Sequence, residues 1–165
     1  TTSFAYTAPG TSTPPRFVLV TDPMGFNERE EWLEPAPVET SDPAASVPLY
    51  RVPGAWEIPV CAEYVLQYTS ADVVICLGIV VRGETGHADL ITQSVSDKLQ
   101  EMAVRHLTPI INMVLLVNNE ADARARVFGD QMNRGVEAAR AALNMAELFS
   151  KLHTAYPTPR KNEDE

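Results

Sequence analysis

The chain has 165 residues, of which 45% are hydrophobic and 21% charged, and its net charge is −9 at pH 7. This length and composition predict one globular domain with a hydrophobic core. The acidic balance argues against nucleic acid or an anionic membrane as a bulk partner, because both attract basic surfaces. No apolar run is long enough to span a bilayer. The composition still allows a local basic pocket for a single phosphate.

The N-terminal residues and the cysteines indicate the environment of the protein. Residues 1–15 are rich in Thr, Ser, Pro and Gly and show no secretory signal, so we expect a flexible arm on a cytoplasmic protein. Cys61 and Cys76 lie in apolar segments and are predicted to be reduced core residues. The three His and two Cys are too scattered for a zinc-ligand spacing, so no metal site is predicted.

The first half of the chain predicts two short strands and one helix. Residues 17–21 form an apolar run typical of a buried strand, and residues 49–52 predict a second strand. A series of prolines between them excludes a long helix there, apart from a turn or two at residues 28–34. Residues 57–67 predict a helix with Pro59 in its first turn. The apolar face of this helix carries Ile58, Cys61, Ala62, Val65 and Leu66.

The next segments predict two strands with a helix between them. Residues 73–79 form an apolar, β-branched run typical of a buried strand, and residues 110–117 predict another. A helix is expected at residues 93–106, with Asp89 or Thr92 as its cap. Its inward stripe is Val95, Leu99 and Met102.

Two helices are expected after the last strand. A short helix would begin at a cap, Asn118 or Asn119, and end at Gly129. The final helix would begin at Asn133, and the residues from 153 onward would form a solvated tail. The inward face of the final helix carries Val136, Ala139, Leu143, Ala146 and Phe149.

Strands that alternate with helices predict a three-layer α/β/α sandwich with a central parallel four-stranded sheet, formed by residues 16–152. In such a sheet, ligands bind beyond the carboxyl ends of the strands. The loops expected to meet there are residues 22–27, 53–57, 80–89 and 117–119.

The loop after the central strand holds the residues best suited to chemistry. It carries Gly83, Glu84, Thr85 and His87 within the run RGETGHAD. Glycines let the backbone approach a ligand closely, and successive free N–H groups can hold an anion. The simpler alternative is that His87 is a surface histidine and that the glycines only turn the chain.

Each of the other candidate residues has a plain structural alternative. Glu57, at a helix start with free backbone donors, could bind hydroxyls or a heterocycle edge, or could only favour the helix dipole. Phe26 could stack on a flat ring or lie in the core. Arg126 could grip a phosphate or lie on a solvated helix face. Arg134 and Glu137 have the spacing of an exposed ion pair.

Three sequence blocks together resemble the lumazine synthase (6,7-dimethyl-8-ribityllumazine synthase) family, which acts in the penultimate step of riboflavin biosynthesis. The blocks are RVPGAWEIP at residues 51–59, GIVVRGETGHAD at residues 78–89 and NRGVEAA at residues 133–139, in the family's order and spacing. The resemblance covers residues 17–152 and is weakest before Tyr50. It implies a flavodoxin-like fold and no metal or organic cofactor.

The resemblance implies that 5-amino-6-(D-ribitylamino)uracil condenses with 3,4-dihydroxy-2-butanone 4-phosphate, giving 6,7-dimethyl-8-ribityllumazine, inorganic phosphate and water. Carried over by motif, His87 is the catalytic proton-transfer residue, and histidine suits that work because its charge changes near neutral pH. Gly83, Glu84 and Thr85 would form the phosphate loop, with Arg126 as its cationic clamp from a neighbouring subunit. The residues that would bind the pyrimidine substrate are Phe26, Ala55, Trp56, Glu57, Val80, Val81, Asn112, Arg134 and Glu137.

The resemblance also implies a homo-oligomer: a pentamer with sites between subunits, and possible assembly into an icosahedral shell. Several positions depart from the family pattern, among them Asn112, where Phe is frequent, and Met113, where Gly is frequent. The part of the site that would bind the pyrimidine ring is therefore altered, and this leaves a second interpretation open. In that interpretation the chain is a non-catalytic family member that binds a flavin or lumazine, or forms a shell.

Overall fold

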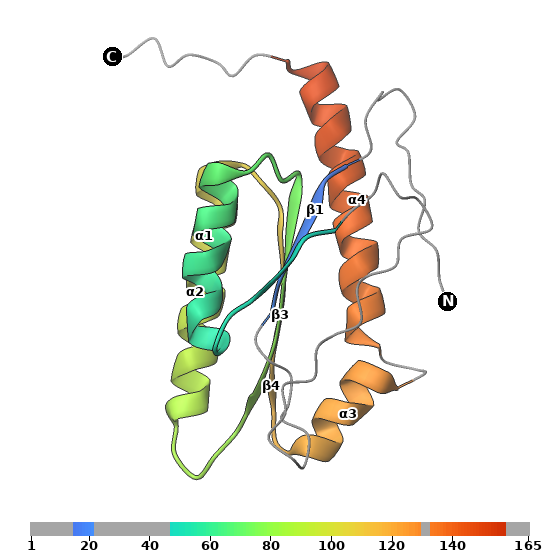
Figure 1. The fold of residues 1–165 in the computed structure, drawn as a ribbon. Coiled ribbons are helices and arrows are strands. Elements are labelled where there is room, and N and C mark those ends of the chain that lie inside the picture. The colour runs from blue at the N-terminus through green and yellow to red at the C-terminus, as the bar shows by residue number, and fades with distance from the viewer. Residues whose placement is uncertain (1–14, 22–46, 130–132, 158–165) are drawn as a thin grey trace.

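The fold is built on one parallel sheet. The computed structural model of the chain describes residues 15–21, 47–129 and 133–157. All three strand pairs are parallel, and the strand order places β3 inside the sheet and β4 at one edge (Figure 1). This arrangement confirms the predicted four-stranded parallel sheet. Its strands, in the order β2-β1-β3-β4, are β1 (Phe17–Thr21), β2 (Leu49–Arg51), β3 (Val73–Val81) and β4 (Ile110–Val117).

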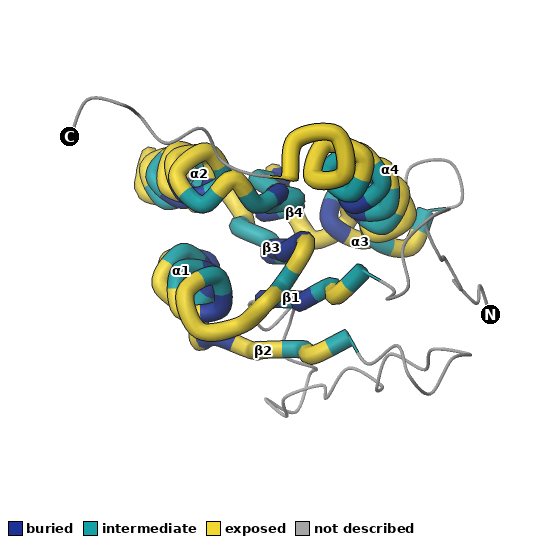
Figure 2. Tube along the Cα trace, turned by 90° about the horizontal axis from the view of Figure 1, so that it is seen from above, coloured by how far each residue is buried: buried dark blue, intermediate teal, exposed yellow. Residues whose placement is uncertain are grey.

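Helices lie on both sides of the sheet. One side carries α1 (Ile58–Tyr68) and α2 (His87–His106), and the other carries α3 (Glu120–Phe128) and α4 (Arg134–Ala155), as Figure 2 shows. A single 3-10 turn, η1 (Ala55–Glu57), precedes α1. These layers confirm the three-layer α/β/α sandwich. Among the described helices, none combines the length and apolar content that a membrane span needs.

The central strand is longer than the sequence predicts. β3 continues from its predicted end at Ile79 to Val81, because its ladder with β4 runs on to the pair Val81–Val117. Val80 therefore belongs to the strand, as does Val81, rather than to the loop that follows. β2 ends at Arg51, one residue before its predicted end.

The larger core lies between the sheet and helices α1 and α2. Leu99 and Met102 of α2 are each 1% exposed, and Ile58 of α1 is fully buried. Cys61 and Leu66 pack against this core from α1. The inward faces predicted for both helices are confirmed.

Both cysteines are free thiols. Cys76 is buried, and the loss of solvation raises the pKa of its thiol to about 12. Cys61 is half-buried, and burial raises its pKa as well. Both thiols therefore stay protonated near neutral pH, as expected of reduced core residues.

Small residues form the face of α4 that meets the sheet. Val73 and Ile75 of β3 are buried in this second core. The predicted inward face is wrong at Val136, which is 40% exposed. Alanines form the inward face of α4 instead, because a helix lies closer to a sheet where no large side chain intervenes. α4 also runs to Ala155, so residues 153–155 are helical rather than part of the predicted tail. The buried residues of α4 are Ala138, Ala142 and Ala146, while Ala139, Leu143 and Phe149 are half-buried.

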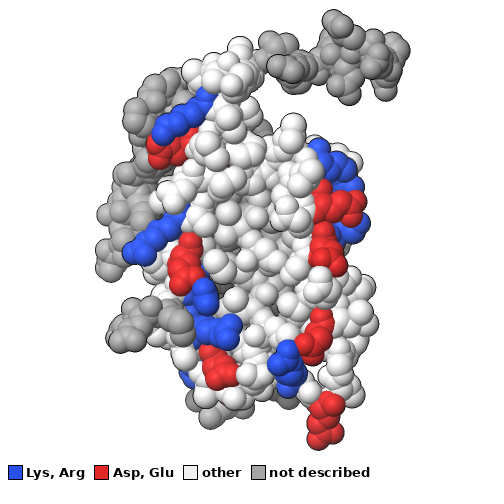
Figure 3. Space-filling view, turned by 180° about the vertical axis from the view of Figure 1, so that it is seen from behind, with Lys and Arg blue, Asp and Glu red and all other residues white. Residues whose placement is uncertain are grey.

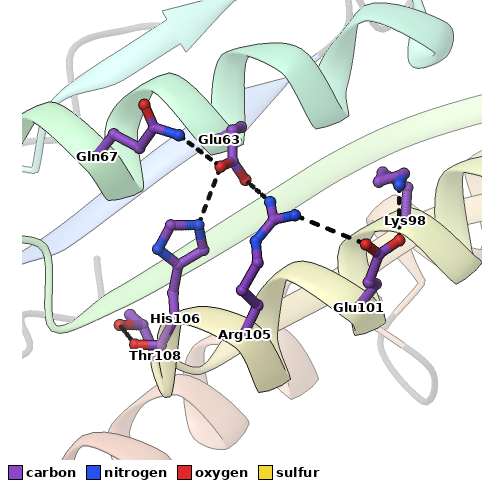
Figure 4. A network of polar contacts seen from close by, with 7 residues as sticks. All are labelled: Glu63, Gln67, Lys98, Glu101, Arg105, His106 and Thr108. Atoms are coloured by element: carbon purple, nitrogen blue, oxygen red, sulfur yellow. Dashed lines mark hydrogen bonds and ion pairs between the residues drawn. The ribbon is translucent and has the colours of Figure 1, made fainter. Parts of the chain in front are cut away.

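A polar network joins α1 to α2 (Figure 4). Glu63 of α1 accepts hydrogen bonds from Gln67 at 2.7 Å and from Arg105 Nη2 at 2.5 Å, and it lies 3.1 Å from His106 Nε2. Partial burial raises the pKa of Glu63, but the hydrogen bonds from Gln67, His106 and Arg105 outweigh it and leave that pKa below its usual value. The network ties together the two helices that border the larger core.

Candidate active site

Helix α2 begins earlier than the sequence predicts. It starts at His87 rather than at Gln93, and Gly86 is its N-cap. Asp89 and Thr92 therefore lie inside the helix, and both predicted caps are wrong. A carboxylate in the first turn favours the helix dipole without capping the helix, which explains the position of Asp89. His87 is the first residue of α2, and its side chain is exposed.

Gly83, Glu84 and Thr85 lie in the open loop between β3 and α2. All three are exposed, and no side chain of residues 83–87 forms a hydrogen bond or ion pair with the described residues. A Cβ added at Gly83 would meet nothing within 4 Å, so the space beside the loop is open. The loop leads into the N-terminus of a 20-residue helix, where free N–H groups and the helix dipole favour an anion. This arrangement can hold a phosphate next to a histidine.

Arg82 joins the two ends of this loop, a role that we did not predict from the sequence. Its Nη2 and Nε lie 2.7 Å and 3.3 Å from the two carboxylate oxygens of Asp89, and its Nη1 donates to Asn118 Oδ1 at 3.0 Å. The hydrogen bond from Arg82 holds the pKa of Asp89 below its usual value. Opposite charges seven residues apart across a glycine loop are the sequence signal that could have revealed this pair.

The turn η1 contacts both β3 and α2. Ala55 is buried, whereas Trp56 is 56% exposed. The Glu57 carboxylate lies over Gly54, where an added Cβ would be 3.2 Å from Glu57 Oε2. Trp56 also lines a groove of about 370 Å³ between α1 and α2, but His87 does not. In a single chain, His87 therefore lies on an open surface outside this groove.

Asn112 lies on the edge strand β4, away from the loop. It pairs with Cys76, four residues before Val80 on β3, which corresponds to about 13 Å at the usual rise of a strand. Its Nδ2 donates to Ser96 Oγ at 3.0 Å, and its Oδ1 accepts from Val114 N at 3.0 Å. Within one chain, Asn112 thus ties the edge strand to α2.

Arg126, Arg134 and Glu137 belong to the helical layer on the other side of the sheet. Arg126 is half-buried in the last turn of α3 and forms no ion pair with the described residues. Arg134 and Glu137 pair with each other in the first turn of α4, which confirms the predicted ion pair, although both residues are half-buried rather than exposed. The Nε of Arg134 is buried and has no hydrogen-bond partner among the described residues.

Asparagine caps position both of these helices. Asn119 begins α3 and Asn133 begins α4, and each side chain accepts from the backbone N–H three residues on, at 2.9 Å and 3.0 Å. Gly129 ends α3, where a Cβ would lie 2.2 Å from Ala125 O, so only glycine fits without a shift. The predicted helix limits are confirmed at these three residues.

One chain brings together only part of the predicted site. The loop, His87, η1 and the end of β3 lie at the carboxyl edge of the sheet. Asn112 and the residues of α3 and α4 lie on the edge strand and in the other helical layer. Phe26 lies outside the described residues. The described part of the chain contains no group of three His, Cys, Asp or Glu side chains that could hold a metal ion.

The fold and the loop define a class of protein. It is a parallel α/β protein whose candidate site combines an open glycine loop and a histidine at the carboxyl edge of the sheet. The sequence profile of the 6,7-dimethyl-8-ribityllumazine synthase family matches residues 33–150. The chain therefore belongs to the 6,7-dimethyl-8-ribityllumazine synthase family.

Individual relatives carry the same name. The chain is 41% identical over 122 residues to a 6,7-dimethyl-8-ribityllumazine synthase of Methylobacterium radiotolerans, with 74% of this chain and 73% of the relative covered. It is 37% identical over 115 residues to that of Xylella fastidiosa strain M12, covering 70% and 75%. It is 38% identical over 107 residues to that of Xanthomonas oryzae pv. oryzae strain PXO99A, covering 65% and 70%.

Proposed function

We propose that this chain is a 6,7-dimethyl-8-ribityllumazine synthase, a transferase of riboflavin biosynthesis. It condenses 5-amino-6-(D-ribitylamino)uracil with 3,4-dihydroxy-2-butanone 4-phosphate and releases phosphate and water. The observation that carries this proposal is the position of His87, which opens α2 directly after the open loop, in a chain of this family. An imidazole beside an anion-binding loop matches a substrate that carries both a carbonyl and a phosphate.

The proposed roles follow the two substrates. Gly83, Glu84 and Thr85 hold the phosphate, and His87 moves protons during imine formation and phosphate loss. Holding both substrates side by side supplies a large share of the rate. The pyrimidine and its ribityl chain bind along η1 and the end of β3, at Ala55, Trp56, Glu57, Val80 and Val81. Phe26, Asn112, Arg134 and Glu137 complete the proposed pyrimidine site.

We further propose that the chain acts as a cytoplasmic homopentamer with sites between subunits. Four observations support contact between subunits. Among the described strands β4 is an unpaired edge, and Figure 3 shows an uncharged band between charged flanks on that side of the molecule. Asn112 is exposed on this edge. Arg126 has no ion-pair partner within its own described chain, which leaves it free to meet a phosphate held by a neighbouring subunit.

The test is an assay of purified protein with both substrates. We expect a fluorescent lumazine product, and a kcat about a hundred-fold lower for His87→Ala, because loss of a general acid–base group typically costs that much or more. A protein that binds the lumazine product but never forms it from the substrates would overturn the proposal in favour of a non-catalytic binding protein.

A further inference from the structure

The Arg82 side chain meets two segments that are separate from it in the sequence. Arg82 follows the last residue of β3, and its backbone N–H donates to Val117 O of β4 at 2.8 Å. Its guanidinium meets Asp89 in the first turn of α2 and Asn118 directly after β4. Asn118 in turn donates to Asp122 Oδ2 in α3 at 3.2 Å. One cation thus connects the ends of two strands with the starts of two helices.

The loop between these contacts is otherwise free. Residues 83–87 carry the proposed phosphate loop and His87, and within the described chain their side chains have no hydrogen bond or ion pair. Gly83 and Gly86 have no side chain to pack, and a Cβ added at either position would meet nothing within 4 Å. The Arg82–Asp89 pair therefore supplies the side-chain restraint across this loop, by closing it at both ends.

Three of the five N–H donors of Arg82 are already used within the chain. Each of its three nitrogens makes one of the contacts to Asp89 or Asn118. Asp89 also offsets its charge at 2.7 Å. A guanidinium used in this way is suited to fixing geometry, since its planar fork matches a carboxylate with two parallel bonds. It is less suited to binding a second anion directly.

We propose that Arg82 is a positioning residue for the proposed reaction. Through Asp89 and Asn118 it sets the shape of the loop that holds the phosphate. It also sets the orientation of His87, the first residue of α2. This inference rests on the proposed function. Its physical basis is that misplacing a bound group by about 1 Å can cost a large part of the rate.

A double-mutant cycle tests the inference. Arg82→Gln and Asp89→Asn keep much of the side-chain size and remove the charged pair. We expect each single variant to lower kcat/KM for the butanone phosphate about ten-fold. We expect KM for the pyrimidine substrate to stay within about two-fold of wild type, because η1 is not held by this pair. The double variant should lose no more than the worse single variant, since both changes break one interaction.

A matched ion pair on α3 provides the control. Arg124 Nε donates to Glu120 Oε1 at 2.8 Å, and both side chains are exposed. Arg124→Gln and Glu120→Gln should leave both KM values and kcat unchanged. Additive losses for Arg82→Gln and Asp89→Asn, or losses no larger than those of the control, would overturn the positioning role.

Binding of inorganic phosphate separates this inference from the proposed function. We expect Arg82→Gln to weaken phosphate binding by calorimetry while its Tm stays near wild type, and Arg82→Lys to weaken it less than Arg82→Gln. If wild type binds phosphate but makes no lumazine, the proposed function fails while the loop restraint can still be measured. If wild type turns over and Arg82→Gln binds phosphate normally with unchanged kinetics, only the Arg82 inference fails.

Discussion

The two helical layers differ in how completely one chain satisfies its own side chains. In the layer of α1 and α2, large apolar residues fill the core and Glu63 receives three polar partners. In the layer of α3 and α4, alanines face the sheet, Arg126 has no ion pair within the described chain, and the Nε of Arg134 has no partner there. The polar network around Glu63 is thus satisfied within one chain, whereas the second layer contains arginine nitrogens without a partner in the described chain.

The predicted site residues divide along the same line. His87, the phosphate loop and η1 border the layer of α1 and α2, and they reach one edge of the sheet through neighbouring segments of sequence. Arg126, Arg134 and Glu137 belong to the other layer. A site that needs both groups is most simply completed when a second copy brings its α3 to the first copy's loop, as in the proposed oligomer.

The largest expected effect is the recovery of activity when two inactive variants, one in each group of site residues, are mixed. His87→Ala and Arg126→Ala should each lower kcat about a hundred-fold when present in every subunit. Co-expressed, the two chains should form mixed oligomers in which about a quarter of the sites carry both native residues, if the site joins two copies. Activity of the purified mixture, measured by lumazine fluorescence, should therefore rise well above that of either variant.

The control mixture pairs His87→Ala with Glu57→Gln. Both changes lie in the same proposed half of the site, so no mixed site contains both native residues and no recovery is expected. Equal recovery in the two mixtures, or none in either, would contradict a site shared between subunits.

Core substitutions compare the two layers through stability. Leu99→Ala removes a large side chain that is 1% exposed, and it should cost about 3 kcal/mol of unfolding free energy. Ala142→Leu inserts bulk where α4 meets the sheet, and it should cost about 2 kcal/mol through overpacking. Denaturant unfolding at one fixed protein concentration measures both, since association also shifts apparent stability. A negligible cost for Ala142→Leu would mean that α4 does not lie close against the sheet.

The fold could be predicted well because its signals are local and periodic. Apolar runs gave the strands, and the stripes of α1 and α2 carried large side chains that mark a buried face clearly. The predicted inward face of α4 was wrong at Val136 because alanine is a weak signal of burial, whereas a larger apolar side chain is a strong one. The start of α2 was placed too late because its N-terminus has no side-chain cap to mark it.

Only those parts of the site whose residues are adjacent in the sequence could be predicted from a motif. The loop and His87 are adjacent in sequence, so a motif brings them together. The contact of Arg82 with Asn118 joins residues 36 apart, and only the pairing of β3 with β4 makes them neighbours. The amide of Asn112 makes a second contact of this kind, because it ties β4 to Ser96 of α2, 16 residues earlier in the sequence, and no linear pattern reveals it.

The smallest expected effect is a pH dependence of stability in the layer of α1 and α2. The pKa of Glu63 lies below its ordinary value of 4.5 in the folded chain, so its ionised form stabilises the fold above about pH 4.5. That stabilisation is lost as pH falls through the lower, folded pKa. Glu63→Gln should therefore lower Tm at pH 7 by an amount that corresponds to at most about 1 kcal/mol, since ion pairs near the surface contribute little.

The difference between wild type and Glu63→Gln should shrink when melts are repeated below pH 4. Gln67→Ala serves as a comparison, because it removes one uncharged donor to Glu63 and leaves Arg105 and His106 in place. Its effect should be smaller than that of Glu63→Gln at pH 7. A Glu63→Gln difference that stays constant from pH 7 to pH 3 would mean that the tie between α1 and α2 depends on packing rather than on the carboxylate charge.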